Sequence, residues 1–350
     1  MTPRHHTVPQ VYLRFFADDA RRVRLVARDD FAASQVTSVR NACAEVGFYR
    51  VDPEAFEVPP GHTPPEPEVI EAYLGGFEAR AAPSLYKLNH TGMADITQDD
   101  WYHLIHFIAL QTVRGNRFRE DLDAAANQAM RTYLGQCATE DRIRAWLEQR
   151  GDPSDPPAVA VFRESLLGDA RPRLLPPQEF YVQESMRFAL TTLSDLLASG
   201  RRWSVIESRG AVLSSDEPVC WWGPGDGPIG YATAPVVWVP LGPRRILQLV
   251  VDDETPESLG LPDNSPRGRD DLVRLVNGLV AGQSHRWIVH HPSDHPLDSL
   301  TLAPRTEWAD ELVAVQESTF ERRELWVHRR LPVPRQSVEA SPTEESGQFS

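Results

Sequence analysis

The chain has 350 residues, of which 41% are hydrophobic and 25% charged, ordinary values for a globular protein that can bury a core. Its net charge of -14 argues against extended, non-specific binding to nucleic acid, because such binding needs clustered cations facing the phosphates. No apolar run is long enough to cross a bilayer, and no cationic start leads into an apolar leader, so we expect a cytoplasmic protein that does not associate with membranes.

The first part of the chain predicts one strand followed by a mainly helical region. Residues 22–28 alternate as a strand does, residues 36–49 suggest a short helix or turn, and the prolines and acids of residues 52–68 predict a loop. Residues 97–100 resemble a helix-capping signal, and Gly115 is expected to break or kink the helix that follows. Helices are predicted over residues 68–81, 101–114, 118–134, 140–149, 158–167 and 178–198.

The hydrophobic pattern changes after Arg202. Short segments rich in β-branched and aromatic residues are separated by Gly, Pro, Asp and Ser, which is typical of an antiparallel sheet. A helix over residues 270–282 interrupts this series. Strands are predicted over residues 203–207, 211–213, 219–222, 236–239, 246–251 and 286–290.

These elements predict an α+β protein. We expect a helical middle region, about residues 68–200, to pack against a mostly antiparallel C-terminal sheet, about residues 201–292. The N-terminal segment is expected to dock into that sheet. The prediction is a single unit over residues 1–332, followed by a polar, disordered tail over residues 333–350.

The N-terminal run from Arg4 to Phe16 combines two histidines, a proline and a glutamine with apolar and aromatic side chains. In an extended segment the rings of His5 and His6 point to opposite faces, so one can be catalytic or bind a metal while the other packs. Alternatively, both rings hydrogen-bond to the backbone and fix the terminus. Gln10 could orient a substrate or lock the segment through its amide.

Gln111, Arg114, Arg117 and Arg119 are the best candidates for binding an anion. Gln111 and Arg114 lie three residues apart on one helix face, whereas the other two arginines lie at the helix break, where backbone N–H groups are also free. Such a site suits a phosphate or carboxylate. In the alternative interpretation these arginines pair with nearby acids and fix the corner between two helices.

Asp216 lies in a Ser-Ser-Asp-Glu-Pro turn between two predicted strands. Its carboxylate could bind a metal or act as a general base. Asp and Ser before Pro are also ordinary turn residues, whose side chains accept hydrogen bonds from nearby N–H groups.

Other motifs give little support for a specific chemistry. The three cysteines have no CxxC spacing, which favours free thiols in a reducing compartment over a disulfide or zinc framework. His103 and His106 are three residues apart without an HExxH pattern, so packing is the simpler interpretation. No GxSxG, Walker or GxGxxG motif is present.

Several separated motifs together resemble the bacterial family catalogued as domain of unknown function 4238. They are HHTVPQVYLRFF at residues 5–16, QTVRGNRFRE at 111–120, SDEPV at 215–219 and PLGP at 240–243, followed by Asn277. The chain departs from the family pattern at Gly115-Asn116, where Thr-Pro is expected, and at Gly242, where Ser is expected. The resemblance, over about residues 4–292, implies one fold unit that places these motifs in a common structure and implies no specific activity.

The leading functional hypothesis is a phosphodiesterase-like or nuclease-like hydrolase, or a transferase, acting on a nucleotide or nucleic-acid end. A histidine would be the general acid or base, Asp216 a second base or the ligand of a divalent metal ion, and the arginines would stabilise negative charge. The alternative is a non-catalytic module that senses a small anionic ligand or a protein partner. Oligomeric state, metal identity and substrate identity do not follow from the sequence.

Overall fold

The structure, a computed structural model, describes residues 3–55, 61, 63–168, 173–225, 229–298, 300–302, 304–317 and 322–332. The chain divides into two compact units, Met1–Leu302 and Ala303–Ser350. In the second unit, strands β11 (Thr306–Glu317) and β12 (Arg322–Pro332) pair antiparallel, whereas the sequence predicted one unit running to residue 332. The predicted tail, 333–350, lies outside the described residues.

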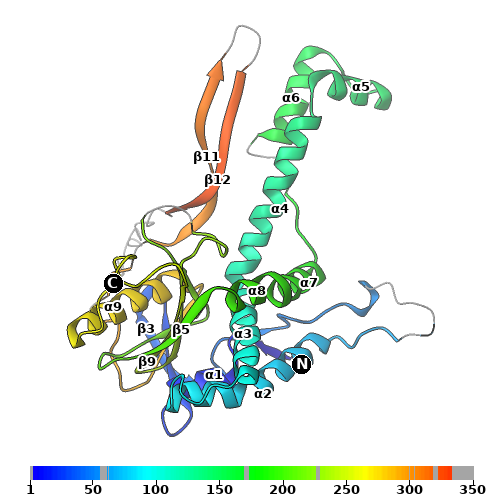
Figure 1. Cartoon of the computed structure of the whole chain (residues 1–350). Coiled ribbons are helices and arrows are strands. Elements are labelled where there is room, and N and C mark those ends of the chain that lie inside the picture. Colours follow the sequence, from blue (N-terminus) through cyan, green and yellow to red (C-terminus); the bar gives the residue numbers. More distant parts are fainter. Residues whose placement is uncertain are drawn as a thin grey trace, which may run out of the picture. The chain divides into compact units, whose positions relative to one another are not determined.

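The first unit combines helices with antiparallel strands, so the predicted α+β class is confirmed (Figure 1). Its strands are β1 (Arg4–His6), β2 (Arg22–Ala27), β3 (Asp30–Ser38), β4 (Ala44–Val46), β5 (Arg201–Glu207), β6 (Ser214–Ser215), β7 (Cys220–Trp222), β8 (Val236–Gly242), β9 (Arg245–Val251) and β10 (Trp287–His290). Its α-helices are α1 (Gln10–Leu13), α2 (Val69–His90), α3 (Gln98–Val113), α4 (Asn116–Cys137), α5 (Glu140–Arg150), α6 (Pro156–Leu167), α7 (Gln178–Phe188), α8 (Ser194–Ala198) and α9 (Pro266–Gln283). Shorter turns are η1 (Arg14–Phe16), η2 (Pro53–Ala55) and the π-helical η3 (Ala189–Leu193).

Strands from both ends of the unit share one sheet. Its order is β3-β2-β10-β6, so the early strand β2 pairs antiparallel with the late strand β10. A second sheet has the order β5-β9-β8-β7, and β1 pairs separately with β4. The expected docking of the N-terminal segment against the C-terminal strands is therefore confirmed.

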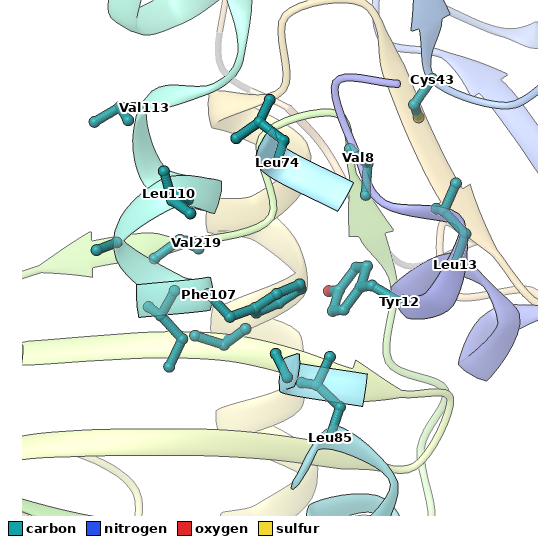
Figure 2. Close-up of a cluster of buried hydrophobic side chains, with 14 of the residues drawn as sticks. Val8, Tyr12, Leu13, Cys43, Leu74, Leu85, Phe107, Leu110, Val113 and Val219 are labelled. Carbon is teal, nitrogen blue, oxygen red and sulfur yellow. The ribbon is translucent and has the colours of Figure 1, made fainter. Parts of the chain in front are cut away.

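Tyr12 anchors the N-terminal segment in the core. Figure 2 shows its ring facing Phe107 of α3, with Val8 and Leu85 close by. Its hydroxyl donates to the carbonyl of Pro240 at 2.6 Å and lies 2.9 Å from the Ser214 hydroxyl oxygen. Because burial strengthens such bonds and makes their loss costly, this one side chain joins the N-terminal segment to β6 and β8.

Replacing Tyr12 with phenylalanine is expected to lower the free energy of unfolding by about 1–3 kcal/mol, because the buried Pro240 carbonyl would lose its donor. Urea denaturation followed by circular dichroism measures this loss. Tyr133→Phe on exposed α4 is the matched control and should stay close to the parent protein. Equal stability of both variants would contradict the anchoring role of Tyr12.

Helix α3 forms the centre of the helical region. Its N-terminus has a capping box, in which the Thr97 hydroxyl accepts from the Asp100 N–H and the Asp100 carboxylate accepts from the Thr97 N–H, as the capping signal predicted. The helix packs against α2, η3, α7 and α8. From Gly115 the chain continues into α4, and α5 and α6 pack at the far end of that helix around Ile143, Leu147 and Val159 (Figure 1).

For residues 36–49 the sequence left a short helix or a turn open, and the turn alternative is confirmed at residues 39–43 and 47–49. β3, which continues to Ser38, and β4 were not predicted there; they form because these segments find backbone partners in β2 and β1. One local prediction is wrong. The strand expected at residues 211–213 is a connection before β6, in which the Val212 N–H donates to the Pro243 carbonyl at 2.9 Å. There the Asn277 amide accepts from the Leu213 N–H at 3.0 Å and donates to the Ala211 carbonyl at 2.8 Å.

Within the described residues, every helix is too short or too polar to span a membrane. The thiols of Cys43, Cys137 and Cys220 are free, as the sequence predicts.

Candidate functional site

The two adjacent histidines point to opposite faces of β1, as an extended backbone requires. His5 is only 1% exposed, and its Nδ1 accepts from the Tyr49 N–H at 2.7 Å. The ring proton must therefore be on Nε2, which donates to the Glu68 carboxylate at 2.5 Å. Since both nitrogens of His5 already have partners, this geometry favours a structural role.

His6 faces the other way and is only partly buried. Its Nε2 lies 3.0 Å from the Arg40 carbonyl, which can only accept, so Nε2 carries the proton and Nδ1 is the acceptor. Burial lowers the pKa of His6 below its ordinary value, and the hydrogen bond to Arg40 opposes this effect only in part. His6 is therefore mostly neutral near pH 7.

Gln111 and Arg114 project from α3 toward the N-terminal segment. The Gln111 amide donates to the Thr7 carbonyl at 3.1 Å, while Nη2 of Arg114 donates to the His6 carbonyl at 2.7 Å. Nη1 of Arg114 donates to Glu78 of α2 at 2.8 Å. The predicted common face is correct, but these bonds hold the protein's own backbone and a carboxylate.

Tyr49 closes the cluster around Arg114. Its hydroxyl donates to the Arg114 carbonyl at 2.7 Å, and its ring stacks on His5 with 5.8 Å between the ring centroids. Burial alone would lower the pKa of Arg114, but Tyr49 and Glu78 raise it above its ordinary value. Arg114 is permanently charged and enclosed by its own partners, which is typical of a structural ion pair.

The sequence analysis missed the acids that complete this cluster. Glu68, Glu71 and Glu78 lie close to one face of α2, and this spacing is the signal that could have revealed them. Burial raises the pKa of Glu71. Oε2 of Glu71 and Oε1 of Gln111 are buried without a hydrogen-bond partner among the described residues.

Arg119 lies beside the Arg114 cluster and lines a small cavity with Tyr49 and Arg114, whereas Arg117 does not line it. Arg119 donates to the Phe48 carbonyl at 2.6 Å and to Gln178 at 3.1 Å, and its guanidinium lies 3.5 Å from the centroid of the Phe48 ring. Burial lowers its pKa. The Arg117 side chain donates to the Gln283 carbonyl at 3.5 Å. Both arginines thus contact protein groups at the corner between α3 and α4.

Asp216 is 7% exposed and accepts three backbone hydrogen bonds, from His285 at 2.9 Å, Arg286 at 2.7 Å and Trp287 at 2.9 Å. Burial raises its pKa, whereas the N–H groups of Trp287 and Arg286 act in the opposite direction. The carboxylate therefore fixes the start of β10. This favours the turn-forming alternative over a base or metal ligand.

Glu217, which follows Asp216, was not singled out in the sequence. Its buried carboxylate accepts from the Arg117 N–H at 3.0 Å and so caps the N-terminus of α4. A Cβ at Gly115 would overlap this carboxylate, which explains why glycine fits at the helix break. Burial, followed by the charge of Asp216, raises the pKa of Glu217 to about 8.

An open cleft of about 620 Å³ contains His6 and Gln10, two of the eight candidates. Its other lining residues are Pro3, Arg4, Ser38, Arg40 and Asn41, so no described lining residue is acidic. Asp216, His5 and the candidate arginines do not line this cleft. The expected single cleft uniting histidines, Asp216 and arginines therefore does not form around His6.

Neither cation of this cleft, Arg4 or Arg40, was a candidate from the sequence, although Arg4 begins the N-terminal run. The Arg4 guanidinium donates to the carbonyls of Ala44 at 2.9 Å and Asn41 at 3.4 Å. The exposed Arg40 side chain has no hydrogen bond or ion pair with the part of the chain that the structure describes. The side-chain amide of Gln10 likewise forms no hydrogen bond with the described residues.

Among the described residues, no three His, Cys, Asp or Glu side chains gather as a group able to hold a metal ion.

Comparison with known proteins identifies a family. No curated protein and no solved structure matches the chain. The family described as protein of unknown function, DUF4238, matches residues 4–294, which include the N-terminal motif, the arginine motif and the Asp216 turn. The chain therefore belongs to the DUF4238 family of proteins of unknown function.

Proposed function

We propose that this protein binds a small phosphate-bearing anion, of the nucleotide class, in the cleft lined by His6, Gln10, Arg4 and Arg40. The observation that carries the proposal is the convergence of two guanidinium groups, an imidazole and an amide on a cleft of about 620 Å³ without a described acidic lining residue. This volume is in the usual range for small-ligand sites.

Arg4 and Arg40 would contribute to phosphate binding in different ways. Two backbone carbonyls hold the Arg4 guanidinium in place, so its position is set before a ligand arrives. Arg40 is exposed and can turn toward a phosphate, where guanidinium groups form charge-assisted hydrogen bonds. The Gln10 amide can donate to a phosphate oxygen, or it can accept from a hydroxyl.

Binding without turnover is the better supported form of this function. The proposed catalytic residues His5 and Asp216 are buried and have all their principal hydrogen-bonding positions taken. Arg114, proposed to bind substrate, is enclosed by Glu78 and Tyr49. A hydrolase acting on the same ligand is the second candidate, because Nδ1 of neutral His6 could act as a general base.

We place this activity in the cytoplasm. The free thiols of Cys43, Cys137 and Cys220 fit a reducing compartment, and nucleotides are abundant there.

Replacing Arg40 with alanine is expected to weaken binding of ADP or pyrophosphate by about tenfold or more, because one charge-assisted hydrogen bond is lost. Gln10→Ala should weaken binding less. Isothermal titration calorimetry on the full chain measures both effects. Arg163→Ala, which removes an exposed arginine from α6, is the charge-matched control and should leave the affinity unchanged.

Absence of saturable binding, or equal affinity of Arg40→Ala and Arg163→Ala, would contradict the proposal. Release of phosphate from ADP by the parent protein, lost in His6→Gln, would instead favour the hydrolase.

A further inference from the structure

A second cavity lies at β5, an edge strand of the sheet β5-β9-β8-β7. Its volume is about 480 Å³, and residues of β5, β9, the loop after β9 and the first turns of α9 line it. It shares no lining residue with the cleft around His6. Whatever binds here is therefore recognised by a separate set of side chains.

Gln248 of β9 presents a hydrogen-bond donor to this cavity. It is 5% exposed, and its Oε1 accepts from the indole N–H of Trp238 at 3.0 Å. An indole N–H can only donate, so the amide oxygen of Gln248 must be the atom that faces Trp238. The amide nitrogen, Nε2, is then the atom that does not contact the indole. Gln248 lines the cavity while Trp238 does not, and Nε2 has no partner among the described residues.

Nε2 is not one of the buried polar atoms that lack a partner, so it reaches the space of the cavity, where its two hydrogens can donate to water or to a ligand. A ligand carboxylate or carbonyl oxygen that displaces this water can accept the same hydrogen bonds.

The rim of the cavity provides one cation and one anion that are not used elsewhere. The side chains of Arg269 on α9 and Glu257 in the preceding loop are exposed and form no ion pair with described residues. The other two acids are engaged, since Glu207 accepts from Arg245 at 2.5 Å and Asp263 accepts from the Ser265 hydroxyl at 2.6 Å.

Apolar side chains complete the wall. Ile206, Leu261 and Leu272 are buried hydrophobic residues that also line the cavity. They offer a surface on which a small apolar group can be removed from water.

We propose that this cavity binds a small zwitterion of the α-amino-acid class with an apolar side chain. Its carboxylate accepts from Gln248 Nε2 and pairs with Arg269, its ammonium pairs with Glu257, and its side chain lies against Ile206 and Leu261. This inference does not depend on the function proposed for the cleft around His6.

Ligands that lack one charge test the proposal without changing the protein. We expect saturable binding of L-leucine or L-methionine to the full chain in calorimetry. The amide of leucine, which lacks the carboxylate, and 4-methylpentanoate, which lacks the ammonium, should each bind at least about tenfold more weakly. If either analogue binds as well as the amino acid, the zwitterion assignment is wrong.

Variants of the two exposed rim residues test the site itself. Arg269→Gln and Glu257→Gln should each weaken binding by about tenfold or more, because each removes one charge-assisted contact. Arg267→Gln, on the same turn of α9 but outside the lining, and Asp253→Asn are the matched controls and should bind as the parent does. No saturable binding of either amino acid, or equal binding by all four variants, would overturn the proposal. Binding of ADP at the His6 cleft should be unchanged in every one of them.

Discussion

Replacing Arg114 with methionine is expected to lower the free energy of unfolding by about 2–4 kcal/mol. Methionine fills much of the buried volume, but it leaves Glu78 without its cation and the His6 carbonyl without its donor. Arg114 is buried whereas Glu78 is partly exposed, so water solvates part of the carboxylate charge that loses its cation, and the cost stays below that of breaking a fully buried pair. Urea denaturation should show a lower midpoint with an unchanged slope.

Two comparisons isolate this effect. Arg50→Met removes an exposed arginine that pairs with Glu68 at 3.1 Å, and it should cost less than about 1 kcal/mol. Combining Arg114→Met with Glu78→Gln should cost less than the sum of the single changes, because the two residues share one interaction. If Arg114→Met instead keeps full stability and loses ADP binding, Arg114 is a ligand-binding residue, as the sequence first suggested.

Helices with local signals were the most predictable part of the fold. The capping box of Thr97 and Asp100 depends on residues three apart in the sequence, so it is visible without any tertiary information. Gly115 likewise marks the break between α3 and α4. Where propensity, period and capping agree over a short stretch, the sequence alone predicts the element.

Strand β3 could not be predicted in this way. Most of its residues are exposed on both faces, so the alternation of apolar and polar side chains that marks a half-buried strand is missing. It forms because β2 provides backbone partners along its length. Such pairing is a property of two segments, and neither sequence reveals it by itself.

The candidate site shows the same limit. Opposite faces for His5 and His6, and a shared face for Gln111 and Arg114, follow from strand and helix periods. Which face is buried depends on Tyr49, which meets His5 across 44 residues of sequence. The strand and helix periods therefore predict correctly which way these side chains point, but they do not predict which residues the side chains contact.

The Glu217→Gln substitution is expected to change how stability depends on pH. In the folded protein the pKa of Glu217 is raised to about 8 from an ordinary value of 4.5, so the folded state keeps a proton that the unfolded chain releases. Its contribution to stability is present below about pH 4.5 and is lost as pH rises toward 8. Glutamine resembles the protonated acid and does not titrate, so the variant should be more stable than the parent at pH 9, by about 2–4 kcal/mol, and similar to it at pH 5.

Urea denaturation at pH 5, 7 and 9 measures the free energy of unfolding of both proteins. The quantity to compare is the difference in this free energy between variant and parent at each pH. The backbone bond to α4 survives in the variant, because the Gln carbonyl can still accept from the Arg117 N–H. Glu148→Gln, at an exposed residue of α5, is the control. Its difference from the parent in the free energy of unfolding should not change with pH. Asp216→Asn should be less stable than the parent at pH 5, because the Asp216 carboxyl group accepts three backbone N–H groups that one amide oxygen cannot satisfy. If the difference in free energy of unfolding between Glu217→Gln and the parent stays constant from pH 5 to 9, Glu217 is ionised in the folded state at neutral pH. The N-terminus of α4 then offsets the cost of burying its charge.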